Sequence, residues 1–344
     1  MSRVTIKDIA KQAGVSTTTV SFAFNYPERL PAETVASILA IAKGLHYVPN
    51  PIARSMLSGR SGTIGVILPS PIHGYMLNPF LADYLQGVSE VCDAEELSFT
   101  ILPPTRKKFE QSINRSMVDG FVTILGIDKD SQEMEFLKQR GIPIVMVDCE
   151  PIEGLSTIKI DDEIGAYEGM KYILACGHRN IAIISGRTES SQPSQNYSDL
   201  FQTRMLGYKK ALSEFGMGFE SPAIRFFDCG DTIAGGAQTF PRVWESKNPP
   251  TAIVTTSDLI AFGVILAAQN IGVRVPQDLS IMGYDDLQLS AGFIPPLTTI
   301  HQPNYEKGKM ATELLIKNIA NSEVQHIILP TELRIRNSVK RINS

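Results

Sequence analysis

The sequence predicts an α/β protein with a small helical head at the N-terminus and a larger body built on parallel sheets. Residues 1–45 carry apolar side chains at helical spacing. From Thr63 onward, short runs rich in Val and Ile alternate with amphipathic segments, which is typical of parallel strands buried on both faces and joined by helices. The chain has 344 residues, more than one hydrophobic core usually serves, so we expect two or three domains.

The head begins with two short helices folded around a tight turn. The first helix ends at Gly14, where the backbone needs a positive φ, and Ser16 can cap a second helix from about Thr17 to Asn25. The apolar stripe of the first helix consists of Ile6, Ile9, Ala10 and Ala13. This spacing predicts a helix-turn-helix. The alternative is a helical pair without a ligand, because the spacing is degenerate.

The second helix offers an outward face suited to DNA. Val20 faces the core, whereas side chains in the N-terminal half point outward, where a recognition helix meets base edges in a major groove. These outward residues are Thr17, Thr18, Ser21 and Phe22. A third helix, from about Ala32 to Leu45, closes a three-helix core with Val35, Ile38, Leu39, Ile41, Ala42 and Leu45.

The body is predicted to alternate strands and helices. The expected strands are Thr63–Leu68, Ser98–Leu102, Gly120–Leu125, Ile142–Val147, Ile181–Ser185, Ala223–Phe227, Ala252–Thr255 and Ser280–Gly283. The expected helices lie at about 79–95, 131–140, 163–176, 200–216, 231–246, 258–271 and 304–320. Two parallel sheets fit this number of strands better than one.

Charge is divided unevenly along the chain. Residues 1–60 hold seven Lys or Arg and three acids, whereas the remainder holds 25 bases and 33 acids. A basic head on an acidic body suits a polyanion partner at the N-terminus, although a solvated helical domain can carry the same bias. The sequence shows no signal peptide and no run long enough to span a bilayer, so we expect a cytoplasmic protein with no membrane partner.

Catalysis is not expected. The sequence lacks a G-x-G-x-x-G after a strand, a G-x-x-x-x-G-K-[ST], a G-x-S-x-G and an H-E-x-x-H. The five histidines have no ligand spacing, and His178 follows a helix end, where it is expected to interact with terminal carbonyls. We interpret the four cysteines, Cys92, Cys149, Cys176 and Cys229, as reduced packing residues. No cofactor or metal is therefore expected.

Acidic side chains follow several of the apolar runs. Asp148, Asp161 with Asp162, Asp258 and Asp285 stand at such ends. Ligands of parallel sheets bind outside the carboxyl ends of the strands, so these residues predict a small-molecule cleft. An aspartate at a strand end also frequently caps the next helix, and this alternative stays open for Asp162 and Asp258.

Several motifs resemble one known family. The run Ile6-Lys-Asp-Ile-Ala-Lys-Gln-Ala-Gly-Val-Ser16, then Tyr47-Val-Pro-Asn50, Ala53-Arg54-Ser55, Gly59-Arg60-Ser61 and Gly65-Val-Ile67, closely resembles the lactose/galactose/purine repressor (LacI/GalR) family of bacterial transcription regulators. The resemblance covers essentially the whole chain.

The resemblance implies a division of the chain into three parts. Residues 1–48 form the helix-turn-helix head, residues 49–62 a hinge helix and linker, and residues 63–344 an effector-binding and dimerisation body. The body has a periplasmic-binding-protein-like fold of two α/β subdomains, joined by crossovers near residues 160, 290 and 322. The N-subdomain is placed at about 63–160 and 291–321, and the C-subdomain at about 161–290 and 322–344.

The resemblance also implies DNA contacts. In the head these are Thr5, Ser16, Thr17, Thr18, Thr19, Ser21, Phe22 and Asn25, and in the hinge Asn50, Ala53, Arg54 and Met56. Phe22 stands where the family usually carries Arg; the alternative is that Phe22 turns into the core of the head. Met56 stands where the family carries an apolar minor-groove wedge, usually Leu; the alternative is that it only packs the hinge pair.

Effector contacts are implied in the same way. They are Phe80, Leu81, Asp162, Arg204, Thr232, Asp258 and Asp285; Asp148 is added to this set because it follows an apolar run. Asp162 stands where Asn is common, and Thr232 where an aromatic residue sometimes stacks on the ligand. Residues 187–202 are longer than usual and form either a lid carrying Tyr197 or Phe201 or a solvated loop. The four acids Asp148, Asp162, Asp258 and Asp285 against the one base Arg204 favour a neutral polyol over a phosphosugar.

The sequence thus predicts a homodimeric, effector-controlled regulator that binds a near-palindromic operator in double-stranded DNA. The expected function is repression of carbohydrate-utilisation genes, with release from DNA by a small sugar. Three alternatives stay open: a solute-binding protein without a DNA role, a corepressor-dependent regulator of a non-sugar metabolite, and an α/β enzyme fused to a DNA-binding head. A tetramer is less favoured than a dimer, because residues 332–344 lack leucine heptads.

Overall fold

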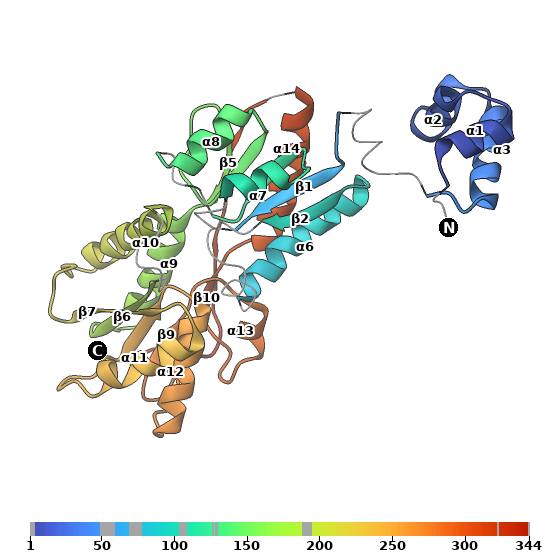
Figure 1. The fold of residues 1–344 in the computed structure, drawn as a ribbon. Helices are drawn as coiled ribbons and strands as arrows, with labels where there is room; N and C mark the ends of the chain where they lie inside the picture. The colour runs from blue at the N-terminus through green and yellow to red at the C-terminus, as the bar shows by residue number, and fades with distance from the viewer. Residues whose placement is uncertain are drawn as a thin grey trace. The chain divides into compact units, whose positions relative to one another are not determined.

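The computed structural model describes residues 4–48, 59–68, 78–102, 109–125, 127, 130–187, 195–321 and 323–342, without the side chains of 187 and 195–201. The chain divides into two compact units, Met1–Gly62 and Thr63–Ser344. Figure 1 shows the helical first unit and the mixed second unit, the body.

The first unit is a three-helix head, as predicted. Its helices are α1 (Ile6–Ala13), α2 (Thr17–Asn25), a 3-10 turn η1 (Pro27–Arg29) and α3 (Ala32–Gly44). Gly14 ends α1 with φ 65°, and the Ser16 hydroxyl accepts a hydrogen bond from the Thr19 amide at 3.0 Å. Ile9, Val20 and Ile38 are almost fully buried and hold the three helices together.

The N-subdomain of the body is a six-stranded parallel sheet of order β11-β5-β4-β3-β1-β2. Its strands are β1 (Thr63–Ile67), β2 (Ser98–Leu102), β3 (Gly120–Thr123), β4 (Ile144–Val147), β5 (Ser156–Ile160) and β11 (His326–Leu329). Helices α6 (Pro79–Ala94) and α14 (Asn304–Asn321) cover one face, and α7 (Phe109–Arg115) and α8 (Gln132–Arg140) cover the other. The strands are apolar because both faces of the sheet are buried.

The C-subdomain is a four-stranded parallel sheet of order β7-β6-β8-β9. Its strands are β6 (Ile181–Arg187), β7 (Ile224–Gly230), β8 (Ala252–Thr255) and β9 (Ser280–Met282). One face packs on α9 (Asp162–Ala175) and α10 (Gln195–Glu214), and the other on α11 (Ile233–Trp244) and α12 (Asp258–Asn270); a short helix α13 (Gln288–Gly292) follows β9.

A small antiparallel sheet of β10 (Thr299–His301) and β12 (Glu332–Arg334) lies where the chain crosses between the subdomains. The first crossover follows β5, as expected. The other two lie further along the chain than expected. Phe293 and Leu297 still pack in the core of the C-subdomain, so the second crossover comes near 302 rather than 290. Strand β11 pairs with β5, so the third comes after Leu329 rather than near 322.

All eight expected strands are present, with ends that differ by a few residues. Strands β5, β10, β11 and β12 and helices α7 and α13 were not expected, since several are only three to five residues long and show no clear period. Helix α10 begins at Gln195, so the second half of the segment 187–202 is helical. For residues 188–194, the choice between a lid and a solvated loop lies outside the described residues. Across the described ranges, none of the helices combines the length and apolarity that a membrane crossing requires.

Candidate functional site

Helix α2 of the head is the predicted recognition helix. Thr17 and Thr18 are exposed, as predicted. Other predicted contact residues also make local bonds: Thr5 pairs with Asp8 in the capping box of α1, and Asn25 donates to the Ser21 carbonyl oxygen at 2.9 Å. Their roles in base or phosphate contact stay predictions. Asn50, Ala53, Arg54 and Met56 lie outside the described residues.

Phe22 is partly exposed and does not belong to the hydrophobic core of the head. Its ring packs edge-on against Tyr26, with 6.0 Å between the ring centroids. The Arg29 guanidinium lies over the same two rings, 5.8 Å from the Phe22 centroid and 4.8 Å from that of Tyr26. The α2 surface therefore presents an apolar ring at position 22, which argues against the alternative of a core phenylalanine.

We expect Phe22 to favour thymine at one half-site position, because an apolar ring can contact the thymine methyl but cannot accept or donate to guanine. Phe22→Arg should shift the preference at that position toward guanine, since Arg bonds guanine bidentately. Selection of binding sites from a random DNA library measures both consensus sequences. The same consensus for both proteins would contradict this assignment, provided circular dichroism shows that the variant head is folded.

The body contains a polar cavity at the carboxyl ends of the strands of both sheets. It is lined by Asn78, Phe80, Leu125, Asp148, Asp162, Arg204, Asp231, Thr256, Ser257, Asp285 and Gln302. The space between these residues, including the part that is open to solvent at the mouth, is about 560 Å³. This is the position at which two-subdomain α/β proteins take small ligands.

Five of the predicted effector contacts line the cavity: Phe80, Asp148, Asp162, Arg204 and Asp285. Leu81, Thr232 and Asp258 are not among its lining residues. Leu81 is buried in the core of the N-subdomain, and the Thr232 hydroxyl caps α11 by accepting from the Gly235 amide at 2.9 Å. Asn78, Leu125, Thr256, Ser257 and Gln302 were missed because amides, hydroxyls and an isolated leucine carry no spacing signal. Asp231 was also missed, although it directly follows β7 and is the same kind of residue as the aspartates that were predicted.

Arg204 and Asp162 form a buried ion pair at the cavity wall. The Arg204 Nε donates to Asp162 Oδ1 at 2.7 Å, and its Nη1 donates to the Thr256 carbonyl oxygen at 2.8 Å. The guanidinium lies 3.7 Å from the centroid of the Tyr284 ring, whose hydroxyl also donates to Asp162. Asp161, not Asp162, caps α9, because the Asp161 carboxylate accepts from the Ile164 amide. The capping alternative for Asp162 is thereby set aside.

A second charged pair, Asp148 with Lys307, was missed from the sequence. Lys307 is completely buried on α14, and its Nζ donates to both oxygens of Asp148 at 2.9 Å. Burial raises the pKa of Asp148, and the Lys307 ammonium opposes that rise. The signal was in the sequence: Lys307, Ala311, Leu314 and Leu315 share one helical stripe, so a lysine occupies a core position of an amphipathic helix.

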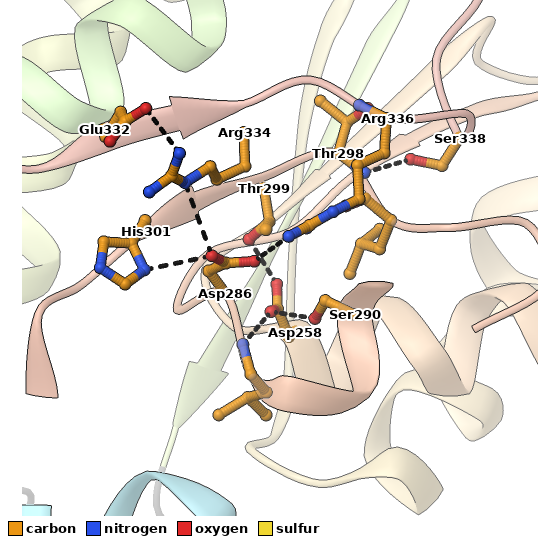
Figure 2. Close-up of polar contacts among 12 residues, drawn as sticks. Asp258, Asp286, Ser290, Thr298, Thr299, His301, Glu332, Arg334, Arg336 and Ser338 are labelled. Atoms are coloured by element: carbon orange, nitrogen blue, oxygen red, sulfur yellow. Dashed lines mark hydrogen bonds and ion pairs between the residues drawn. The ribbon is translucent and has the colours of Figure 1, made fainter. Parts of the chain in front are cut away.

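Asp258 is buried in the body and held by hydrogen bonds to neighbouring elements (Figure 2). Its carboxylate accepts from the Leu287 amide at 2.9 Å, the Ser290 hydroxyl at 2.5 Å and the Thr299 hydroxyl at 2.6 Å. Ser257, the preceding residue, caps α12 instead of Asp258. Asp258 thus ties the turn after β9 to β10, which connects the C-subdomain to the crossover sheet.

Asp285 and Asp286 link the cavity to the crossover sheet. Asp285 lines the cavity, and burial raises its pKa well above the ordinary value, with the neighbouring Asp258 adding to the rise. Asp286 lies beside β10 and β12 and bonds Arg336 at 2.6 Å and His301 at 3.1 Å (Figure 2). Both aspartates have positive φ, 124° and 55°, a conformation that non-glycine residues rarely adopt and that is concentrated at functional sites.

A helix-turn-helix head joined to a two-subdomain body with a polar cleft defines a ligand-responsive DNA-binding protein. The chain belongs to the lacI family of bacterial regulatory proteins, whose family model matches residues 5–50; a periplasmic binding protein-like domain matches residues 170–339. It is a transcriptional repressor of this family and not an enzyme.

Known proteins support this over the whole chain. The transcriptional repressor PurR of Photobacterium profundum is 33% identical over 98% of this chain and 99% of its own length. The ribose operon repressor of Haemophilus influenzae is 34% identical over 95% and 96%. In fold, the chain is similar to the structure of the lac repressor dimer bound to operator and an anti-inducer, with a TM-score of 0.83 and 24% identity over 98% of this chain and all of that one.

Proposed function

We propose that this protein is a homodimeric, cytoplasmic repressor of carbohydrate-utilisation genes, and that a neutral sugar bound in the body cavity releases it from DNA. Two heads related by a two-fold axis suit two halves of a near-palindromic operator. The sugar would change the relative pose of the subdomains and thereby the affinity of the heads for DNA. The observation that carries the effector class is the charge of the cavity wall.

The cavity wall offers more hydrogen-bond acceptors than cations. Among the lining residues whose side chains the structure describes, Arg204 is the single cation, and Asp162 and the Thr256 carbonyl oxygen already engage it. Lys307 adds a second positive charge behind the wall, but Asp148 and Gln302 engage its ammonium. The comparison of four acids with one base, made from the sequence, is therefore revised to include Lys307 as a second cation. The conclusion stands, because a phosphate would face the carboxyl groups of Asp148, Asp162, Asp231 and Asp285, whereas sugar hydroxyls can form hydrogen bonds with these groups.

A ligand screen tests the effector class. Neutral sugars, beginning with D-ribose because one relative is a ribose operon repressor, are compared with sugar phosphates and purines by thermal shift and isothermal titration calorimetry. We expect at least one neutral mono- or disaccharide to raise the melting temperature and to bind in calorimetry. Binding by purines or phosphosugars alone would contradict the proposal and favour a corepressor-dependent regulator.

The proposed hinge wedge makes a separate prediction. Met56→Ala should weaken operator binding at least about tenfold, or about 1.4 kcal/mol, because an apolar wedge between base steps stabilises a bent DNA. Sugar affinity should stay within a factor of about two. Met117→Ala, at an exposed methionine of the body, is the matched control. Unchanged operator affinity would contradict the wedge, and weaker binding with unchanged DNA bending in a gel assay would indicate hinge packing only.

A further inference from the structure

Lys307 uses all of its hydrogen-bonding capacity inside the body. Its three ammonium protons match three acceptors: Asp148 Oδ1 and Oδ2, each at 2.9 Å, and Gln302 Oε1 at 3.0 Å. The ammonium also lies 5.1 Å from the centroid of the Phe80 ring, which lines the cavity. The charge is therefore held directly behind the cavity wall.

Gln302 connects the Lys307 ammonium to Asp285 of the C-subdomain. Because its carbonyl oxygen accepts from Lys307, its amide group must face the opposite way, and the Nε2 donates to Asp285 Oδ1 at 2.6 Å. The reversed amide would place its protons against the ammonium, which has no lone pair to offer. Lys307 thus fixes the orientation of Gln302, and Gln302 presents a donor to Asp285.

The chain Asp148–Lys307–Gln302–Asp285 connects the two walls of the cavity. Asp148 follows β4 of the N-subdomain, Asp285 follows β9 of the C-subdomain, and Gln302 lies at the second crossover. Stability alone gives no reason for this arrangement, because a buried ion pair is often no more stabilising than apolar side chains of similar volume. An apolar residue at position 307 would continue the buried stripe of α14 formed by Ala311 and Leu314.

We propose that Lys307 is the positioning residue that sets the ligand preference of the cavity, by holding Asp148 directly and Asp285 through Gln302 as hydrogen-bond acceptors. This inference rests on the proposed sugar-binding function for its ligand. With both carboxylates presented as acceptors, the cavity selects ligands rich in hydroxyl donors. Without the ammonium, Asp148 would hold a proton and donate, and the Gln302 amide could reverse.

The first test needs no ligand. In Lys307→Met, loss of the cation should raise the pKa of Asp148 further, because burial and the Asp162 charge raise this pKa and only the Arg204 charge still lowers it. Tyr84 also faces Asp148. A raised pKa in the folded state makes stability fall as pH rises, so the variant's melting temperature should fall more steeply between pH 5.5 and 8.5 than the parent's, by about 5 °C.

Two variants control this measurement. Lys309→Met makes the same substitution on the same helix, where the lysine is partly exposed and pairs with Glu90, and should keep the parental pH profile. The double variant Lys307→Met with Asp148→Asn removes the titrating carboxyl, so the steeper fall of the melting temperature with pH should disappear. This double variant also keeps the test usable if Lys307→Met alone folds poorly. A Lys307→Met profile parallel to that of the parent would overturn the proposal.

The second test uses D-ribose, D-galactose and D-glucose in calorimetry between pH 6 and 9. For whichever of these sugars binds the parent, Lys307→Met should bind at least about tenfold more weakly at pH 6 and recover as Asp148 ionises at higher pH, whereas Lys309→Met should match the parent. Equal affinity and a flat pH profile in Lys307→Met would overturn the proposal. If none of these three binds the parent, the neutral sugar found in the ligand screen replaces them. If that screen finds no neutral sugar, the sugar-binding function fails, and the ligand-free pH profile still decides the role of Lys307.

Discussion

Replacing Arg204 with methionine is expected to lower the free energy of unfolding of the body by about 3–5 kcal/mol, because it leaves the Asp162 carboxylate buried without its cation. The bond to the Thr256 carbonyl oxygen and the contact with the Tyr284 ring are lost as well. Urea unfolding followed by circular dichroism measures the change. Arg274→Met is the matched control: its ion pair with Asp278 is exposed, so its loss should change the free energy of unfolding far less than Arg204→Met does.

The same substitution should separate sugar binding from DNA binding. We expect Arg204→Met to lower neutral-sugar affinity at least about tenfold while operator binding persists, which gives a repressor that stays on DNA. Adding Asp162→Asn removes the uncompensated charge and should restore most of the stability but not the sugar response. A double variant that regains both would show that Arg204 is only structural.

Stability of the body should depend on pH through Asp258. Burial raises the pKa of Asp258 to about 7, even though three hydrogen bonds oppose the rise. The unfolded value is about 3.9, so the folded state binds this proton more tightly. Its contribution to stability is therefore complete below pH ~4 and is lost as pH rises through about 7, a loss of about 2–4 kcal/mol.

Asp258→Asn tests this assignment. The variant cannot titrate at this position, so its free energy of unfolding should fall less than that of the parent between pH 4.5 and 8 in urea unfolding. The exposed Asp93→Asn is the control and should follow the parent. Burial still raises the pKa of Asp285 in Asp258→Asn, but without the contribution of the Asp258 charge, so the difference between the two curves reports the titration of the Asp258–Asp285 pair. Parallel curves for the parent and Asp258→Asn would contradict the assignment.

The sequence predicted the head and the alternating body because their signals are local. Gly14 and Ser16 mark the turn of the head by backbone and capping chemistry that does not depend on distant residues. The central strands are continuous apolar runs, which only buried parallel strands require. The short strands β10 and β12 carry no such run and exist because each pairs with the other across the crossover, more than 30 residues apart in sequence.

The candidate site was predicted only where its residues carry a local signal in the sequence. Asp148, Asp162 and Asp285 could be found because each follows an apolar run, and Arg204 because the family motif marks it. Whether an aspartate faces the cavity or the protein interior depends on its neighbours in space: Asp258 accepts from Ser290 and Thr299, which lie 32 and 41 residues further along the chain. Partners at that separation cannot be inferred from local spacing.

The most direct test of the central claim is the operator affinity of the full-length protein with and without a bound sugar, measured by fluorescence anisotropy on an operator obtained by site selection. A neutral sugar that binds the body should weaken operator binding at least about tenfold, and by thermodynamic reciprocity a saturating operator should weaken sugar binding by the same factor. Equal operator affinity with and without that sugar, or tighter operator binding in its presence, would contradict the account.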